Sequence, residues 1–293
     1  MVYDGPIMDN HFHLNRRGRY LDAAWDFKRT GGTHVVLVHC PDFSSPPTTL
    51  DGHREAYADT VAMAAALRSE VGLSTRVVLG PHPAAFAHQF ERWVSEDGEQ
   101  GKERAVENYR ASIDAAMAFL DEGEAHAIGE VGRPHWPVSD EVWALSNELL
   151  EETMHMAAQG GFPLQLHVEG ESDATYGDLA MRARRQGMAL DMLIRHYSPP
   201  NIDGAYTHGL TPSVLAGKGS VETIMASVER RTHGFFLETD YMDDLRRPGA
   251  VLGPKTVPKR TRQLLEAGLD ESIMWDTHHD LPLRLYGDAT PAS

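Results

Sequence analysis

Cysteine is almost missing from the sequence, since Cys40 is the only one among 293 residues. A single cysteine excludes an internal disulfide and any zinc site built on cysteine pairs. Long apolar runs are missing too, and none approaches the roughly 18 residues that a membrane-spanning helix needs. The N-terminal stretch MVYDGPIMD has neither the basic nor the apolar region of a signal peptide. These absences predict a cytoplasmic protein with no membrane partner.

Basic side chains are scarce as well. Lysine and arginine together number 27 against 43 acidic residues, which gives a formal net charge of −16. Such a balance argues against a broad surface that binds a nucleic-acid backbone. It leaves room for a small site that takes one strand end or a small molecule, because bound metal ions can supply local positive charge.

Two nucleotide-binding signals are also missing, because no G-x-G-x-x-G follows the first apolar run and no G-x-x-x-x-G-K-[ST] occurs. What the sequence does contain is a series of short, valine-rich apolar runs separated by amphipathic stretches. Besides a strand ending at His11, strands are predicted at 33–40, 75–83, 125–132, 162–170, 191–198, 204–211 and 234–240. Helices are predicted at 20–30, 51–71, 101–122, 139–159, 173–186, 220–231 and 256–267.

Eight strands that alternate with helices predict a single-domain α/β protein, a (β/α)8 TIM barrel over 1–287 followed by a tail at 288–293. We expect the stretch 84–101 to be a polar excursion on the surface. A loop rather than a helix is expected between the sixth and seventh strands.

Imidazole and carboxylate side chains end most of the predicted strands. In a TIM barrel these ends converge at one mouth. His11 and His13 are two apart, so in a strand they point to the same side. The set at the strand ends is His11, His13, Glu130, His167, His196 and Asp240. His39 and His208 end the second and seventh predicted strands and are candidates for supporting these ligands.

Acids and imidazoles gathered in one buried place predict a site for divalent metal, because unpaired buried charge is costly. We expect His11, His13 and Asp240 to hold one ion and His167 and His196 a second, with Glu130 bridging them. Coordination lowers the pKa of a bound water to about 7, so hydroxide held there would attack a substrate, with Asp240 orienting the water or accepting its proton. The ligand types suit Zn, Mn, Co or Fe and one ion or two. Neither the metal nor the oligomeric state follows from the sequence.

The strand-end residues lie in motifs that resemble the TatD-type branch of the amidohydrolase superfamily. These motifs are DNHFHL (9–14), GPHP (80–83), IGEVG (128–132), LH (166–167), RHYS (195–198) and LETD (237–240). The stretch 237–261 is similar to an archaeal group of TatD-related predicted hydrolases. The resemblance implies a metal-dependent hydrolase on a TIM barrel with the ligand roles given above. In well-described members it implies DNase activity.

Departures from the family pattern concern the substrate. The family usually has GEiGLD at strand 4, whereas here Arg133 and Pro134 follow Gly132. Two residues after the strand 5 histidine the family often has arginine, and here Glu169 stands there, where it would repel a phosphate. The strand 6 pattern also differs, since the family's HcFsG has become His196-Tyr197-Ser198-Pro199 here.

Two further classes of function therefore stay open beside a phosphodiesterase. One is hydrolysis of a small-molecule amide, lactone or ester, and the other is a non-catalytic metal-binding protein. The predicted substrate contacts are His82, Arg133 and Lys255, and His135 with Trp136 is a candidate pocket wall that could stack on a ring.

Overall fold

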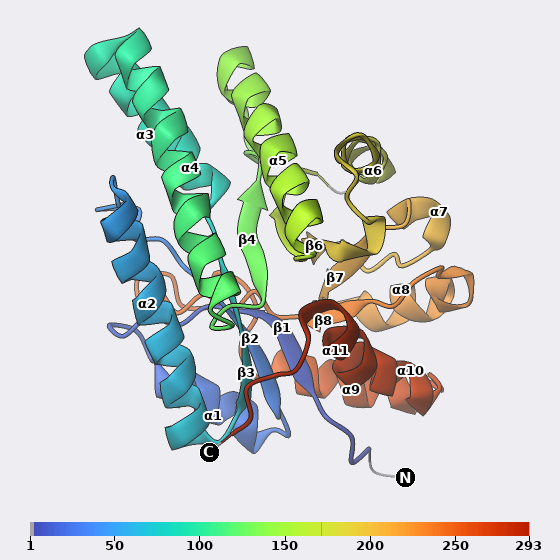
Figure 1. Cartoon of the computed structure of the whole chain (residues 1–293). Coiled ribbons are helices and arrows are strands. Elements are labelled where there is room, and N and C mark those ends of the chain that lie inside the picture. Colours follow the sequence, from blue (N-terminus) through green and yellow to red (C-terminus); the bar gives the residue numbers. More distant parts are fainter. Residues whose placement is uncertain (1–2, 171, 293) are drawn as a thin grey trace.

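The computed structural model describes residues 3–170 and 172–292, and it confirms the TIM barrel (Figure 1). Eight parallel strands are hydrogen-bonded in sequence order from β1 to β8. They are β1 (Met8–Phe12), β2 (His34–Val38), β3 (Ser74–Leu79), β4 (Ala127–Gly132), β5 (Leu164–His167), β6 (Leu193–Ser198), β7 (Thr211–Leu215) and β8 (Phe236–Glu238). The first and last strands meet where Phe12 forms a parallel bridge with Tyr241 and the His13 amide donates to the Tyr241 carbonyl at 2.9 Å.

Helices surround the barrel, as the alternation of patterns predicts. They are α1 (Leu21–Arg29), α2 (Leu50–Ala66), α3 (Pro83–Asp97), α4 (Glu99–Asp121), α5 (Asp140–Gly160), α6 (Asp173–Gln186), α7 (Gly204–Thr207), α8 (Ser220–Ser227), α9 (Thr256–Glu266), α10 (Glu271–Trp275) and α11 (Leu281–Tyr286). The start of α5 shows why one of them forms where it does. Ser139 caps it by accepting a hydrogen bond from the Val142 amide, and Asp140 and Glu141 favour its positive end.

The stretch 84–101, expected as a polar excursion, instead forms most of α3 and the start of α4, so that prediction is wrong. His82 caps α3 by accepting from the Ala84 amide, and Pro83 occupies the first turn, where its missing amide costs nothing. Phe86, Phe90 and Trp93 then fall on one buried face. Figure 1 shows α3 running beside α4 as an antiparallel hairpin.

The seventh predicted strand lies too early in the sequence. Residues 204–207 form the short helix α7, which Asp203 caps by accepting from the Ala205 amide at 2.9 Å. His208 ends this helix in the left-handed conformation, and β7 begins only at Thr211. Pro212 lies inside β7 and lacks an amide donor, so the sequence of residues 211–215 is not typical of a strand.

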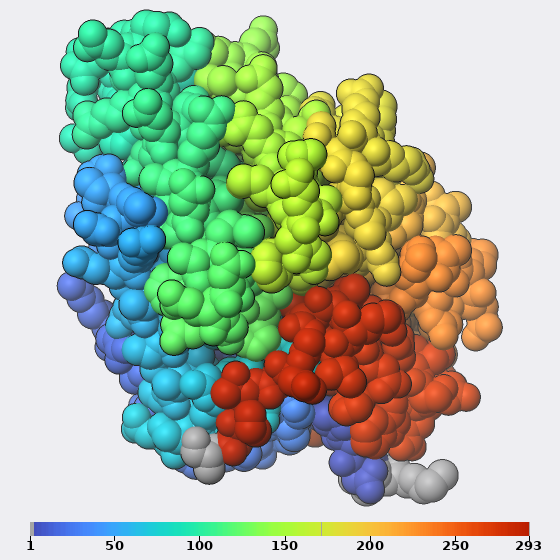
Figure 2. Space-filling view, in the orientation of Figure 1, coloured from blue at the N-terminus to red at the C-terminus, as the bar shows by residue number. Residues whose placement is uncertain are grey.

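The end of the barrel opposite the mouth is covered by the C-terminal segment. The buried His278 accepts a hydrogen bond from the Met8 amide through Nδ1 at 3.1 Å. Thr290, in the predicted tail, exchanges two backbone hydrogen bonds with Thr75, both at 2.9 Å. In Figure 2 the red atoms of this segment lie against the green atoms of the middle of the chain. None of the helices within the described residues is long and apolar enough to cross a bilayer.

Candidate metal centre

The structure brings all six predicted ligands together at the C-terminal ends of the strands. His11 lies in β1 and His13 directly after it, on the same side, while Asp240 follows β8. Glu130 comes from β4, His167 ends β5, and His196 lies in β6. Five of the six are buried to at least nine-tenths of their surface, and His167 is the more open one.

His11, His13 and Asp240 form the first cluster, which we call the β1/β8 half. The two histidine Nε2 atoms lie 3.0 Å apart. Glu130 Oε1 is 3.2 Å from each of them. Asp240 Oδ1 is 3.5 Å from His13 Nε2 and 3.9 Å from His11 Nε2. Four potential ligand atoms thus surround one point.

The other oxygen of Glu130 faces the second cluster, the β3/β5/β6 half. Oε2 of Glu130 lies 2.6 Å from His167 Nδ1 and 3.5 Å from His196 Nε2. His82, at the end of β3, contributes a third imidazole, with Nε2 also 3.5 Å from this oxygen. Each oxygen of the Glu130 carboxylate therefore faces a different cluster, which is the geometry that the predicted bridging role needs.

Hydrogen bonds on the far side of three imidazoles turn their Nε2 atoms inward. His13 Nδ1 donates to the Val38 carbonyl at 3.0 Å, and His11 Nδ1 donates to Gln165 Oε1 at 2.8 Å. His196 Nδ1 lies 2.9 Å from Glu238 Oε1. Because the carbonyl and amide oxygens can only accept, they fix the ring tautomers of His13 and His11 and leave Nε2 free as a ligand.

Glu238 and Gln165 are functional candidates that the sequence reasoning missed. Each lies two residues before a predicted ligand, Glu238 at the end of β8 before Asp240 and Gln165 within β5 before His167. In β5 this spacing places Gln165 and His167 on one face, and the two-residue spacing was the signal that could have identified both candidates. Ser213 donates to Glu238 Oε2, and the hydroxyl of Tyr286 accepts from Gln165 at 2.8 Å.

The electrostatics of the cluster suit a bound cation. Burial lowers the pKa of His82 and of His196 well below the usual range, which keeps both rings neutral. A neutral His196 can be a metal ligand, whereas His82 accepts from the Ala84 amide through Nδ1 and therefore carries its proton on Nε2. Burial also acts to lower the pKa of His13, but hydrogen bonds to Asp240 and Glu130 outweigh it and raise that pKa well above its usual range. The carboxylates thus attract positive charge to this point. A divalent ion that displaces the proton of His13 would find imidazole and carboxylate ligands, which fit such an ion.

Arg133 lies beside this centre and donates hydrogen bonds to three side chains. Its Nε and Nη2 donate to the two oxygens of Glu169, both at 2.7 Å, and its Nη1 donates to Asn147 at 2.8 Å and to Asp178. Its side chain is 2% exposed and its guanidinium lies over the Trp143 ring. Glu169, expected to repel a phosphate, is therefore paired with a cation, which removes the basis of that expectation. Substrate binding by Arg133 stays a prediction, and in the structure its side chain forms hydrogen bonds with Glu169, Asn147 and Asp178.

Three further predicted residues form contacts of their own or lie exposed. Lys255 stands at the start of α9, is 61% exposed on its side chain and pairs with Asp26 at 3.3 Å, so its role as a substrate contact stays a prediction. His208 ends α7 and is exposed, so it does not end a strand as expected. His39 follows β2, and its Nδ1 lies 2.9 Å from the Thr60 hydroxyl.

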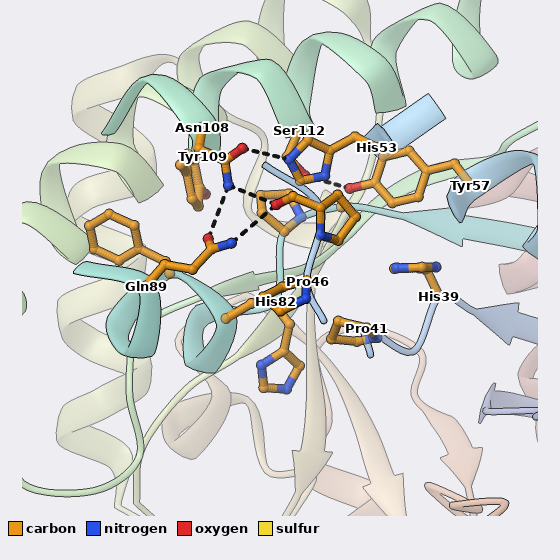
Figure 3. Close-up of a pocket in the computed structure, with 15 residues that line it drawn as sticks. His39, Pro41, Pro46, His53, Tyr57, His82, Gln89, Asn108, Tyr109 and Ser112 are labelled. Carbon is orange, nitrogen blue, oxygen red and sulfur yellow. Dashed lines mark hydrogen bonds between the residues drawn. The ribbon is translucent and has the colours of Figure 1, made fainter. Parts of the chain in front are cut away.

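Two cavities adjoin the centre. One, of about 30 Å³, lies behind His82 and is lined by residues of α2, α3 and α4. Figure 3 shows Asn108 hydrogen-bonded to His53 and Gln89 on one side of it and His82 on another. The other is an open cavity of about 330 Å³ bordered by His135, whose Nδ1 is 2.8 Å from His167 Nε2.

Comparisons with known proteins identify the family of the chain. Residues 8–287 match the family model described as TatD-related DNase. An uncharacterized protein of Methanocaldococcus jannaschii is 31% identical over 285 residues, which cover 96% of this chain and 95% of that protein.

Solved structures share the fold at lower identity. A TatD-like protein of Archaeoglobus fulgidus is 18% identical with a TM-score of 0.62, and the match covers 95% of this chain and 99% of that chain. The TatD homolog YjjV of Escherichia coli is 16% identical with a TM-score of 0.60 and coverage of 96% and 98%. With a match over nearly its whole length, the chain belongs to the family of TatD-related DNases.

Proposed function

We propose that the protein is a divalent-metal-dependent hydrolase that cleaves a phosphodiester at the end of a nucleic-acid strand. The observation that carries the proposal is the position of Glu130, whose Oε1 faces His11 and His13 while its Oε2 faces His167, His196 and His82. A carboxylate placed in this way can bind one ion on each side. Two divalent ions at such a site would lower the pKa of a bound water and polarise a phosphoryl oxygen.

The side chains around the centre supply positioning and proton transfer. Asp240 has 13% of its side chain exposed, more than Glu130, so it can reach the attacking water and accept its proton. His82, also 13% exposed, is available to donate a hydrogen bond to a substrate oxygen. Glu130, buried among imidazoles, stays ionised because His82, His196 and His11 outweigh the effect of burial and hold its pKa well below the usual range.

The choice of a phosphodiester over an amide is supported by family membership and by the Arg133–Glu169 pair. Because both oxygens of Glu169 accept from Arg133, its charge is offset at the mouth, and a phosphate can approach without meeting an unpaired acid. The net charge of −16 fits a small site for a strand end or a small phosphodiester better than a long binding surface.

The experiment is the release of nucleotides from single-stranded DNA by protein loaded with Mn²⁺ or Zn²⁺. Asp240→Asn should abolish release, while Asp121→Asn, at the end of α4, should not change it. Metal content is measured for all three proteins, so that loss of an ion is separated from loss of the proton acceptor. If the folded, metal-loaded wild type released nothing from DNA but hydrolysed an amide, lactone or ester, the phosphodiester assignment would be wrong.

A further inference from the structure

An open cavity of about 330 Å³ lies between the loops that follow β4 and β5, and we call it the tryptophan pocket. Trp136, Trp143, His135 and Glu169 are among the residues that line it. His135 joins it to the metal centre, because its Nδ1 lies 2.8 Å from Nε2 of His167. A group in this pocket would therefore be attached close to the bond that the centre cleaves.

Protein contacts hold each indole of this pocket in place. Trp136 stacks on His88 of α3, with ring centroids 5.6 Å apart and planes inclined by 20°, and His135 meets it edge-on at 5.1 Å. Trp143 has the Arg133 guanidinium 4.9 Å from its ring centre. Each ring thus has one side in contact with another side chain and also borders the open cavity. Such pre-positioned rings lose little freedom when a flat ligand stacks on them.

The charge in the pocket is largely compensated. The carboxylate of Glu169 accepts two hydrogen bonds from Arg133, both at 2.7 Å. Asp140 lies in the first turn of α5, where the exposed amides of the helix offset its charge. An unpaired ammonium group would find no free counter-ion among these two acids, whereas a neutral flat ring meets mainly the aromatic and proline side chains of the lining.

From these contacts we infer that the tryptophan pocket binds a nucleobase of the substrate by stacking, with Trp136 as the main platform. This inference rests on the proposed phosphodiesterase function and specifies its substrate as a base-bearing nucleotide. Bases stack on aromatic side chains with little regard to sequence, because each base has a flat face. The pocket then gives a strongly acidic protein a way to hold a strand end through its base.

The test compares two phosphodiesters with the same leaving group, the p-nitrophenyl ester of thymidine 5′-monophosphate and methyl p-nitrophenyl phosphate, which carries no base. The wild type should prefer the nucleotide ester in kcat/KM. Trp136→Ala should reduce this preference about tenfold, mainly through KM, and Trp136→Phe should retain most of it. The control is Trp275→Phe in α10, an exposed tryptophan that does not line the pocket and should leave the preference unchanged.

A binding measurement separates this inference from the proposed function. Thymidine 5′-monophosphate should quench tryptophan fluorescence in the wild type, and Trp136→Ala should lose about tenfold in affinity, whereas deoxyribose 5-phosphate should bind weakly to both. If neither ester is hydrolysed, the phosphodiesterase assignment fails and the quenching still tests the pocket. An unchanged preference and unchanged nucleotide affinity in Trp136→Ala would overturn the inference.

Discussion

The two halves of the metal centre differ at one imidazole, because His167 is more exposed than the other histidine ligands predicted for the site. In the β1/β8 half, His11 and His13 are anchored from behind by Gln165 and by the Val38 carbonyl, and both rings are almost fully buried. In the β3/β5/β6 half, His167 is 17% exposed on its side chain and its outer nitrogen contacts His135 at the protein surface.

We therefore expect a preformed metal position in the β1/β8 half and a position that is open to the substrate in the β3/β5/β6 half. Rings fixed by hydrogen bonds to backbone and amide groups need little rearrangement when an ion binds. The β3/β5/β6 half lies beside the tryptophan pocket, so its ligands share their surroundings with the substrate. We therefore expect the β1/β8 half to bind metal more tightly and the β3/β5/β6 half to respond more strongly to substrate.

The largest effect is expected from Glu130→Gln, because this side chain serves both halves. The variant keeps the shape but loses the charge, so both ions should bind more weakly and turnover should fall by at least about a hundredfold. Metal content after dialysis and initial rates measure the two effects. Wild-type metal content in this variant would show that Glu130 does not bridge the halves.

Removing one imidazole from each half should separate them. His13→Ala should abolish the tighter phase of a calorimetric Mn²⁺ titration, while His167→Ala should abolish only the weaker phase. The physical reason is that each ring contributes to one ion position alone. Equal loss of both phases in either variant would contradict two distinct positions.

A smaller effect is expected from Glu238→Gln. The buried Glu238 contacts His196 Nδ1, and burial raises its pKa to about 8. Its carboxyl is therefore largely protonated at neutral pH, but it can ionise when a cation binds beside His196, whereas the amide of glutamine cannot. We expect metal affinity to fall about 10- to 100-fold in the β3/β5/β6 half. The same titration should show an unchanged affinity in the β1/β8 half, and the exposed Glu148→Gln should behave as the wild type.

The smallest effect concerns the opposite end of the barrel. Burial lowers the pKa of His278 to about 3, whereas in the unfolded chain it is near 6.5. Between these values only the unfolded chain takes up the proton, so stability falls as the pH drops through this window, by up to about 1.4 kcal/mol per pH unit.

His278→Gln should therefore reduce the pH dependence of the free energy of unfolding between pH 6 and 4, measured by urea denaturation. Metal binding in both halves should be unchanged at neutral pH, since this side chain contacts Met8 and Thr261 rather than the ligands. A wild-type slope in the variant would show that His278 is not protonated on unfolding in that range.

The sequence predicts the barrel and the ligands because both follow from local pattern. Each ligand stands at or near the end of an apolar run, and parallel strands bring such ends together whatever lies between them. The partners of those ligands are harder to predict. Arg133 and Glu169 carry opposite charges on neighbouring loops 36 residues apart, and only the pairing of β4 with β5 makes them an ion pair.

The local sequence pattern gave a wrong prediction in two places, where polar residues or a proline lie next to or within an apolar run. Polar residues at 95–101 concealed the apolar spacing of Phe86, Phe90 and Trp93 in α3, and Pro212 concealed β7. In both places the contacts of the folded chain decided the structure. Helical or strand preference is a weak guide when tertiary packing opposes it.

The most direct test of the account is an anomalous-diffraction map of crystals loaded with Mn²⁺. The account predicts two peaks on either side of Glu130, about 3.5–4 Å apart, one within reach of His11, His13 and Asp240 and the other within reach of His167 and His196. In Glu130→Gln crystals both peaks should weaken. A loaded, active protein with peaks away from Glu130 would contradict the proposed centre.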